Sequence, residues 1–123
     1  MKRLPDSELE VMQIIWDINE PVDRSDIEKQ LYKKHKIATT TLLTLLYRLA
    51  EKGFISIEKN GRRSRYRALV DKKEYLSQQG SFFFKDLCSG DVGILANALC
   101  NSKLTKEEIE ELRKLLEDSA YER

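Results

Sequence analysis

The chain has few of the residues from which metal sites and disulfide frameworks are built. Its 123 residues include two cysteines, Cys88 and Cys100, and a single histidine, His35. Two thiols cannot form the disulfide framework of a small secreted domain, and one imidazole cannot supply a metal cluster. We therefore expect a reducing, cytoplasmic setting, no metal or other cofactor, and side-chain packing as the role of both thiols. The sequence has few of the residues that a hydrolase, a zinc enzyme or a dinucleotide-dependent enzyme would need, and we expect no enzymatic activity.

Long apolar runs are also missing. No uninterrupted stretch approaches the roughly 20 residues of a membrane helix. The N-terminus runs straight into charge at Lys2, Arg3 and Asp6, which is unlike a secretory signal. Hydrophobic residues make up 41% of the chain and charged residues 35%, so there is enough apolar material for a core. These observations predict a folded chain that does not insert into a membrane.

The near-neutral net charge of +1 conceals a difference between the two parts of the chain. Residues 1–70 contain 14 Lys and Arg against 10 Asp and Glu, whereas residues 71–123 contain 8 against 11. The segment from Lys59 to Arg67 carries five basic residues and no acidic one. Such a charge asymmetry is typical of a protein in which the basic part, here residues 1–70, binds a polyanion and the other part has a different role. A solvated hairpin that is basic by chance would look the same.

Capping and turn residues divide the chain into predicted elements. The stretch Ser7–Glu10 matches a capping box, and the helix it opens is apolar on most sides, so it should be largely buried. Asp23 is placed to cap the next helix, and Gly53 is placed to end the one after it. Asn60-Gly61 favours a type I′ hairpin turn, in which both residues have positive φ, and Thr105–Glu108 matches a second capping box. Helices are predicted over residues 7–19, 25–34, 39–52, 71–87, 92–100 and from 105 onward, with strands over 54–59 and 62–69 and a short strand at Pro21-Val22.

The order of these elements indicates the fold class. Three helices followed by a β-hairpin is the order of a winged helix-turn-helix. The chain should therefore be mainly α-helical with a small β-hairpin, and residues 1–70 should form a winged-helix DNA-binding domain. Residues 71–123 should form a C-terminal helical dimerisation domain.

The predicted helix over residues 39–52 has two contrasting sides. One side is a leucine stripe that should pack in the core, formed by Leu42, Leu45, Leu46 and Leu49. The opposite side carries hydroxyls, one arginine and one acid, and comprises Thr40, Thr41, Thr44, Tyr47, Arg48 and Glu51, with Thr39 leading into it.

Threonine mildly disfavours helices, so this row of four threonines does not serve helix stability. Hydroxyls can bond phosphate oxygens or base edges, and this helix is the one that a helix-turn-helix inserts in the major groove. Glu51 argues against phosphate contact near the end of the helix, so contacts should concentrate in the first two turns. Leu43 lies on the flank, where it could touch a thymine methyl or simply pack. The plainer alternative is that Thr39 caps the helix and the other threonines are ordinary solvated residues.

The hairpin supplies the second set of candidate DNA-binding residues. Arg63, Arg65 and Arg67 alternate along the returning strand, and Arg62 sits at the tip. Such a wing can lay arginines along the phosphate backbone or place one in the minor groove. We expect Arg62 and Arg63 to reach DNA, whereas Arg67 is as well placed to pair with an acid or to cover the core. A different function also remains open, in which the arginines of a winged-helix interaction module bind an acidic protein.

The last three predicted helices carry more apolar surface than they can bury among themselves. Packing against the first domain is one outlet for this surface, to which Tyr75 also contributes, and pairing with a second copy is the other. We favour a two-fold interface, because short DNA-reading modules commonly gain affinity by pairing on a palindrome. The candidate dimer-interface residues are Phe82, Phe83, Leu87, Val92, Leu95, Leu99, Ile109, Leu112 and Leu116.

Three stretches together resemble one family. Residues 7–16 (SELEVMQIIW), 41–55 (TLLTLLYRLAEKGFI) and 104–112 (LTKEEIEEL) are similar, in this order, to the BlaI/MecI family of bacterial repressors. The resemblance covers nearly the whole chain, and the three motifs are specific in combination.

The resemblance implies a homodimeric repressor whose N-terminal winged helix binds inverted-repeat operator DNA and whose C-terminal helices dimerise. Members typically control β-lactamase or penicillin-binding-protein genes. A membrane β-lactam sensor with a metalloprotease domain relieves repression, and the repressor is cut in its dimerisation region. By position, the family's DNA-contacting residues match Thr40, Thr41, Leu43, Thr44 and Arg48, with Arg62 at the wing tip.

The chain departs from the family pattern at several positions. Leu43 stands where relatives tend to carry a polar or basic side chain, which allows a different operator. Ala38 stands where a capping serine is usual, so the helix should start at Thr39. The family's scissile Asn-Phe bond matches Asn101-Ser102, a candidate proteolytic site with serine in place of phenylalanine. The two cysteines do not form the cluster of a copper-responsive relative, and we expect His35 to be an exposed helix-end residue.

Overall fold

A computed structural model describes residues 2–121 of the chain. It divides into two compact units, an N-terminal unit up to Gln79 and a C-terminal unit from Gly80 onward. Among the described residues, no helix is long and apolar enough to cross a membrane.

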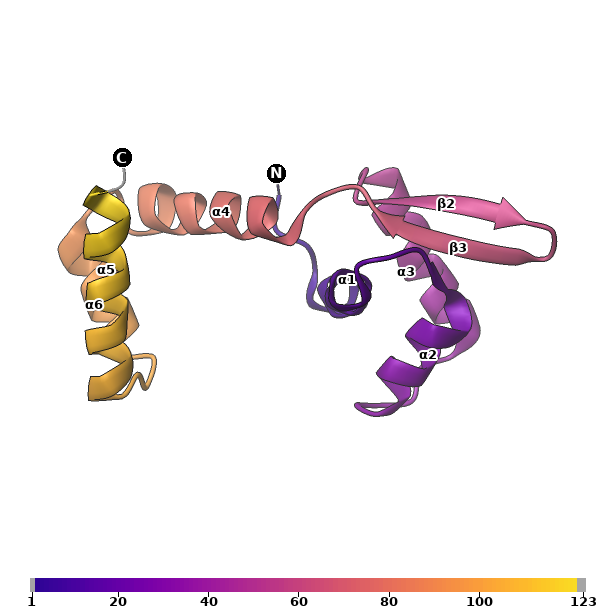
Figure 1. Ribbon diagram of the computed structural model, residues 1–123, viewed down its shortest axis with the longest axis horizontal. Helices are drawn as coiled ribbons and strands as arrows, with labels where there is room; N and C mark the ends of the chain where they lie inside the picture. Colours follow the sequence, from indigo (N-terminus) through magenta and orange to yellow (C-terminus); the bar gives the residue numbers. More distant parts are fainter. Residues whose placement is uncertain (1, 122–123) are drawn as a thin grey trace. The chain divides into compact units, whose positions relative to one another are not determined.

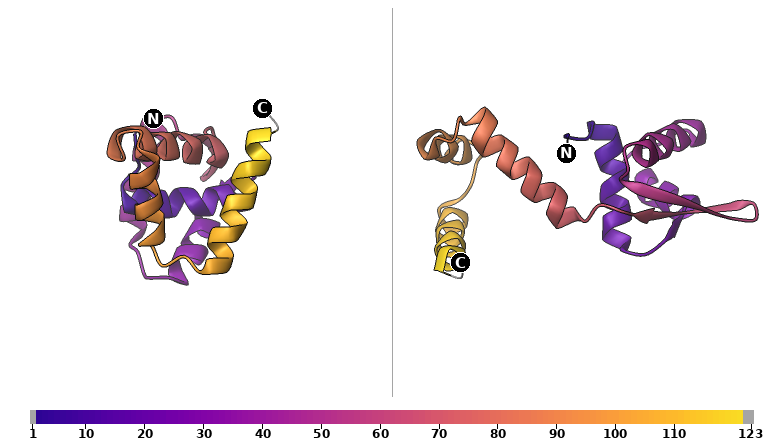
Figure 2. Two further views of the ribbon diagram at one scale, coloured as in Figure 1. Left: turned by 90° about the vertical axis from the view of Figure 1, so that its left-hand side faces the viewer. Right: turned by 90° about the horizontal axis from the view of Figure 1, so that it is seen from above.

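The N-terminal unit is a winged helix, which confirms the predicted fold class (Figure 1). Its sheet is antiparallel with strand order β1-β3-β2, and Tyr66 of β3 pairs with Val22 on one side and Ile57 on the other. The hairpin of β2 and β3 extends past the helices (Figure 2). The elements are α1 (Asp6–Ile18), β1 (Val22–Asp23), α2 (Arg24–Tyr32), α3 (Thr39–Glu51), β2 (Ile55–Asn60), β3 (Arg63–Ala68) and the first part of α4 (Lys72–Phe82).

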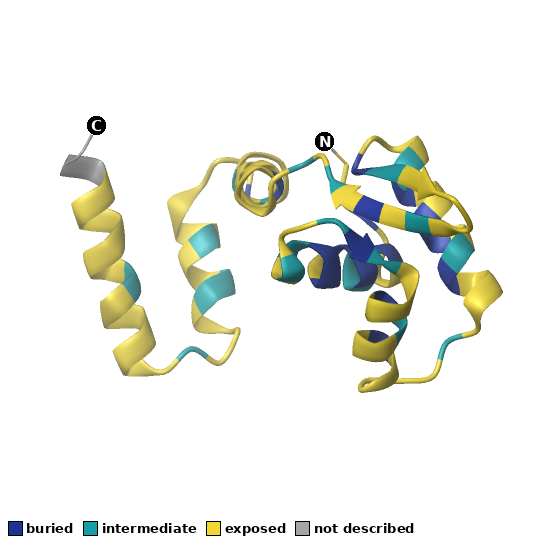
Figure 3. Ribbon diagram, turned by 45° about the vertical axis from the view of Figure 1, so that its right-hand side comes forward, coloured by how far each residue is buried: buried dark blue, intermediate teal, exposed yellow. Residues whose placement is uncertain are grey.

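The core of this unit lies where α1, α2 and α3 meet the sheet, and buried positions line the facing sides of these elements (Figure 3). Val11, Met12 and Ile15 of α1 are almost completely buried, as expected for a helix that is apolar on most sides. The short strand expected at Pro21-Val22 is present but lies one residue later, at Val22–Asp23, and it gives the hairpin a third strand that anchors it to the start of α2.

The predicted start of α1 is wrong. The helix begins at Asp6 after Pro5, and no side chain caps it. The carboxylate of Glu10, which a capping box would need, instead lies 2.6 Å from Nε2 of His35. His35 is exposed, as expected. Asp23 occupies the cap position of α2 but likewise makes no capping hydrogen bond.

The predicted hairpin turn is wrong by one residue. Asn60 pairs with Arg63, so the loop consists of Gly61 and Arg62 rather than Asn60 and Gly61. Only Gly61 has positive φ, at 67°, so the turn lacks the two positive φ angles of type I′. The shift extends β2 by one residue and places Arg62 in the turn itself.

The end of α3 is as predicted. Gly53 has a φ of 81°, its N–H donates to the carbonyl of Ala50, and the N–H of Phe54 donates to the carbonyl of Leu49. These two bonds form a Schellman motif, which satisfies carbonyls at the helix end and turns the chain into β2.

The first turns of α4 belong to the N-terminal unit because Tyr75 is part of its core. Tyr75 is 3% exposed, and its ring packs against Trp16 and edge-on against Phe54. Its hydroxyl accepts a hydrogen bond of 2.9 Å from the backbone N–H of Leu4. Nε1 of Trp16 donates to the carbonyl of Val70 at 2.8 Å, which fixes the approach to α4. Tyr75 thus packs against the first domain rather than adding to the apolar surplus of the last helices.

The C-terminal unit contains the end of α4, which continues as a π-helical turn over Phe83–Leu87, and two further helices, α5 (Val92–Cys100) and α6 (Lys106–Tyr121). Asp91 caps α5 by accepting from the N–H groups of Gly93 and Ile94. The capping box before α6 is confirmed, because Thr105 and Glu108 exchange reciprocal side-chain to backbone bonds of 2.9 and 3.1 Å.

We predict that Tyr75→Phe lowers the free energy of unfolding of the N-terminal unit by about 1–3 kcal/mol, because it leaves the N–H of Leu4 buried without an acceptor. Urea unfolding followed by the fluorescence of Trp16, the single tryptophan, measures this change. Tyr32→Phe is the matched control, since Tyr32 is 67% exposed. Equal stability of the two variants would contradict the prediction.

Candidate nucleic-acid interface

The leucine stripe fixes which side of α3 faces solvent. Leu42, Leu45, Leu46 and Leu49 are all buried, as predicted. The opposite side is open, and its residues Thr40, Thr41, Thr44, Tyr47, Arg48 and Glu51 are all exposed. The hydroxyl-rich side of α3 is therefore open to solvent and is not sealed inside the unit.

The threonine hydroxyls differ in what they already bind. Thr39 is the first residue of α3, its cap position is held by Ala38, and its hydroxyl donates to Oε1 of Glu28 at 3.3 Å. Thr39 therefore does not cap the helix. The hydroxyl of Thr44 donates to the carbonyl of Thr40 at 3.0 Å, so its lone pairs are left to accept.

The wing presents its arginines on one side of β3. Arg63, Arg65 and Arg67 are exposed, whereas the alternating Ser64 and Tyr66 point inward. Arg67 pairs with Glu58 at 3.2 Å, which confirms that it is suited to pair with an acid, and Arg65 lies 3.6 Å from Asp23.

The arginines at the tip of the wing are not neutralised. Within residues 2–121, neither Arg62 nor Arg63 forms an ion pair, and the same holds for Arg48 on α3. The unpaired positive charge of this region is therefore concentrated at the wing tip and on the exposed side of α3, where a polyanion can reach it.

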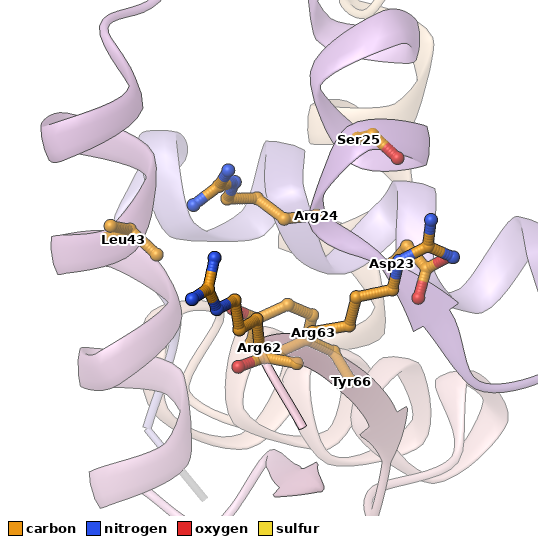
Figure 4. A pocket seen from close by; sticks show the side chains of 8 residues that line it. Asp23, Arg24, Ser25, Leu43, Arg62, Arg63 and Tyr66 are labelled. Carbon is orange, nitrogen blue, oxygen red and sulfur yellow. The ribbon is translucent and has the colours of Figure 1, made fainter. Parts of the chain in front are cut away.

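A pocket of about 360 Å³ joins the wing tip to α3 and to the start of α2. Arg24 extends from α2 toward α3, where Leu43 lies, and the arginines of the wing approach from the hairpin (Figure 4). The lining residues are Asp23, Arg24, Ser25, Leu43, Arg62, Arg63, Ser64 and Tyr66. The pocket therefore brings together three of the predicted DNA-binding residues, Leu43, Arg62 and Arg63.

Sequence reasoning missed Arg24 and Ser25 at this pocket. Both open α2, and the N–H groups of a helix start favour anions. Arg24 also lies 3.3 Å from Glu28, the same carboxylate that accepts from Thr39, so the start of α2 is linked to the start of α3. Their place in the sequence could have identified them, because they begin the helix that precedes α3 in a helix-turn-helix.

Tyr66 forms the inner wall of the pocket and is 3% exposed. Burial raises the pKa of its phenol above the usual value near 10, and the hydrogen bond with Ser64 and the charge of Arg24 offset part of this rise. The phenol is therefore neutral at pH 7, and it does not repel an anion held by the surrounding arginines.

An ion pair between buried Glu8 and half-exposed Lys52 ties the end of α3 to α1. Glu8 is 2% exposed, and its Oε1 lies 2.6 Å from Nζ of Lys52, at the cap position of α3. The pair joins residues 44 positions apart. It holds the C-terminal end of α3 against the core while the first turns face solvent.

The C-terminal unit holds the predicted interface residues, and most of them are exposed. Val92, Leu87 and Leu116 are each more than 60% exposed, and Phe82 is 51% exposed. An apolar groove of about 260 Å³ runs between α5 and α6, and its lining includes Val92, Leu95, Leu99, Ile109, Leu112 and Leu116. Phe82, Phe83 and Leu87 lie outside this lining.

The cysteines and the candidate proteolytic site also lie in this unit. Cys88 is buried, as expected, but Cys100 is exposed and lines the groove, so the expectation of packing is wrong for Cys100. Asn101 and Ser102 form the exposed turn after α5, and Ser102 bonds back to the carbonyl of Leu99 at 2.6 Å.

Fold and surface together define a winged helix-turn-helix protein with a cationic, hydroxyl-rich face. A family model described as "Penicillinase repressor" matches residues 4–118. The chain belongs to the penicillinase repressor family, as its resemblance to BlaI and MecI proteins implied.

Relatives and solved structures agree with this assignment. The "Penicillinase repressor" of Bacillus licheniformis is 33% identical, covering 96% of this chain and 94% of the relative. The "Methicillin resistance regulatory protein MecI" of Staphylococcus aureus (strain N315) is 30% identical, covering 89% of each. The solution structure of the DNA binding domain of the repressor BlaI matches with a TM-score of 0.52 and 33% identity, over 61% of this chain and 94% of that one. The Bacillus licheniformis BlaI monomeric form, solved in complex with the blaP half-operator, matches with a TM-score of 0.50 and 32% identity, over 60% and 89%.

We predict that replacing Lys52 lowers the free energy of unfolding more than replacing its partner Glu8. Lys52→Met should lower the free energy of unfolding by about 1–3 kcal/mol, because it leaves the Glu8 carboxylate buried and unpaired. Glu8→Gln should cost less, because an amide still bonds and the side chain of Lys52, 43% exposed, is hydrated when released. Urea unfolding of both variants, with Lys36→Met as the exposed control, measures the difference. A larger loss for Glu8→Gln would show that the buried carboxylate is not the costly partner.

Proposed function

We propose that this protein is a homodimeric transcriptional repressor that binds inverted-repeat operator DNA and controls β-lactam-resistance or related genes. The observation that carries the proposal is the exposed threonine and arginine side of α3 next to the unpaired arginines of the wing. The family assignment supports it, since relatives are described as a penicillinase repressor and as a methicillin resistance regulator. Such a protein acts where the DNA is, in the cytoplasm, and blocks transcription by occupying the promoter.

The proposed contacts divide between base reading and backbone binding. The first two turns of α3 enter the major groove, where Thr40, Thr41 and Thr44 offer hydroxyls to base edges and phosphates and Arg48 offers a cation. Thr39 lies at the start of the same side. Glu51 keeps the far end of the helix away from the backbone.

The wing and the start of α2 hold the phosphate backbone beside the groove. Within residues 2–121 neither Arg62 nor Arg63 forms an ion pair, so their charge is available to release counterions from DNA. Arg24 and Ser25 face the same pocket and can bind the same strand. The solved complex of the BlaI monomeric form with a half-operator supports one such winged helix per half-site.

Dimerisation through residues 71–123 completes the proposal. Most of the candidate interface residues are exposed, whereas Leu95, Leu99 and Leu112 are half-buried, and an apolar groove lies between α5 and α6. A second copy that covers this surface would remove it from water and join two half-site contacts in one complex. The second contact then becomes intramolecular, which raises the affinity for an inverted repeat.

Release of the operator would follow from loss of the dimer. A cut between Asn101 and Ser102 would separate α5 from α6 and so divide the groove, and this turn is exposed. We place such a cut downstream of a membrane β-lactam sensor with protease activity. Serine stands here in place of the family's phenylalanine, and N-terminal sequencing of the cleaved chain identifies the bond that is cut.

We predict a steep salt dependence for binding to DNA selected from a random pool. A dimer that neutralises about 6–10 phosphates loses roughly 10³–10⁵ in affinity between about 50 and 200 mM salt. Arg62→Ala and Arg48→Ala should each weaken binding and flatten the slope of log affinity against log salt, by about one for each phosphate that the variant no longer neutralises. Gel-shift titrations measure both effects.

Arg67→Ala is the matched control, because it removes the same charge from the same hairpin as Arg62→Ala, but Arg67 is paired with Glu58. A flat salt response in the wild-type chain would contradict DNA binding as the function. Weak DNA binding that neither arginine variant alters would favour the alternative, an interaction module for an acidic protein.

We predict that Leu116→Glu converts the dimer to a monomer at micromolar concentration, because it places a carboxylate in the apolar groove. Sedimentation velocity measures the change, and the monomer should bind an inverted repeat much more weakly. Leu69→Glu is the control, since Leu69 is 59% exposed in the N-terminal unit. A monomeric wild-type chain would overturn the proposed dimer.

A further inference from the structure

Leu43 is the apolar exception on the open part of α3. It is half-buried, whereas the four residues of the leucine stripe are buried and the neighbouring Thr40 and Thr44 are exposed. Leu43 lines the pocket with Arg24, Arg62 and Arg63, and none of the four hydrophobic residues of the stripe does so. Its side chain is therefore directed toward the ligand side of α3 and does not serve the core (Figure 4).

A leucine side chain restricts what it can recognise. It has no donor or acceptor, so it cannot read the hydrogen-bonding pattern of a base pair. Facing a polar base edge in the groove, it would remove water from that edge without replacing the lost hydrogen bond. The apolar feature that a standard base presents in the major groove is the C5-methyl group of thymine.

The surroundings determine where this contact lies. Arg62 and Arg63 reach the pocket from the wing and Arg24 reaches it from α2, so a phosphate backbone held there passes beside Leu43. Thr44 follows Leu43 on α3 and Thr40 lies one turn before it, so both hydroxyls lie on the same side of Leu43 on the helix surface. On bound DNA, hydrogen bonding by the threonines and methyl contact by the leucine would then fall on neighbouring bases.

We propose that Leu43 is a specificity-determining residue that reads the C5-methyl of one thymine in each operator half-site, next to the backbone held by the arginine-lined pocket. The inference rests on the proposed function and deepens it by naming the base chemistry that this position selects. It predicts a half-site with a required thymine whose methyl group, and not its pairing edge, carries the preference.

The test uses the full chain and duplexes selected by it from a random pool. Each thymine of the selected half-site is replaced in turn by deoxyuridine, which pairs with adenine in the same way but lacks the methyl group. For the wild type, one position should lose affinity by about fourfold per half-site, which corresponds to the burial of about one methyl group. Leu43→Ala should lose affinity for the thymine duplex and show no further loss with deoxyuridine at that position.

Two comparisons make the result specific. Leu43→Ile keeps the apolar surface and should keep the dependence on the methyl group, and Leu115→Ala, an exposed leucine of α6, should leave it unchanged. The inference is overturned if the wild type binds its selected DNA tightly and no thymine-to-deoxyuridine change weakens it, or if Leu43→Ala retains the full loss. Failure to select any DNA would instead overturn the proposed function itself.

Discussion

Burial of the leucine stripe of α3 is the constraint on which the rest of the N-terminal unit depends. Four leucines on one side of the helix are packed against α1 and the sheet, and this packing sets the rotation of α3 about its axis. Once the rotation is set, Thr40, Thr41, Thr44 and Arg48 must face outward. The Glu8–Lys52 pair and the Schellman turn at Gly53 then fix the far end of the helix. The same hydrophobic burial that stabilises the unit therefore displays its polar surface.

Ion pairing, rather than the number of arginines, determines which part of the wing keeps its positive charge. Two of the arginines on β3 face acids, Arg67 with Glu58 and Arg65 with Asp23, and these pairs stabilise the hairpin modestly at most because they are half exposed. The tip is left positively charged, and it faces α3 across a pocket that also contains Arg24. A net charge of +1 for the whole chain is thus compatible with a strongly cationic local surface.

The sequence pattern correctly predicted features that depend on residues close along the chain. It was wrong where a contact with a distant part of the chain decides the structure. The leucine stripe of α3 and the alternating arginines of β3 follow from spacing alone. The capping box at Ser7–Glu10 failed: the helix begins at Asp6, before the expected cap, and the Glu10 carboxylate contacts His35, 25 residues away. The turn was shifted because a single glycine with positive φ suffices there, so Asn60 remains in the strand. Arg24 and Ser25 were missed because their role at the pocket exists only once α2 is packed beside the wing.

The two units differ in how much of their apolar surface they bury, and this difference supports the proposed dimer. In the N-terminal unit the core is closed, and even Tyr75 of α4 is drawn into it. Among the described residues from Gly80 onward, Cys88 alone is buried, while α5 and α6 leave an apolar groove open to solvent. A small unit that hides so little of its apolar surface gains little stability from its own folding. Under the proposed function a second copy would cover this groove, and folding of the C-terminal unit, dimerisation and binding to a two-fold DNA site would then form one coupled equilibrium.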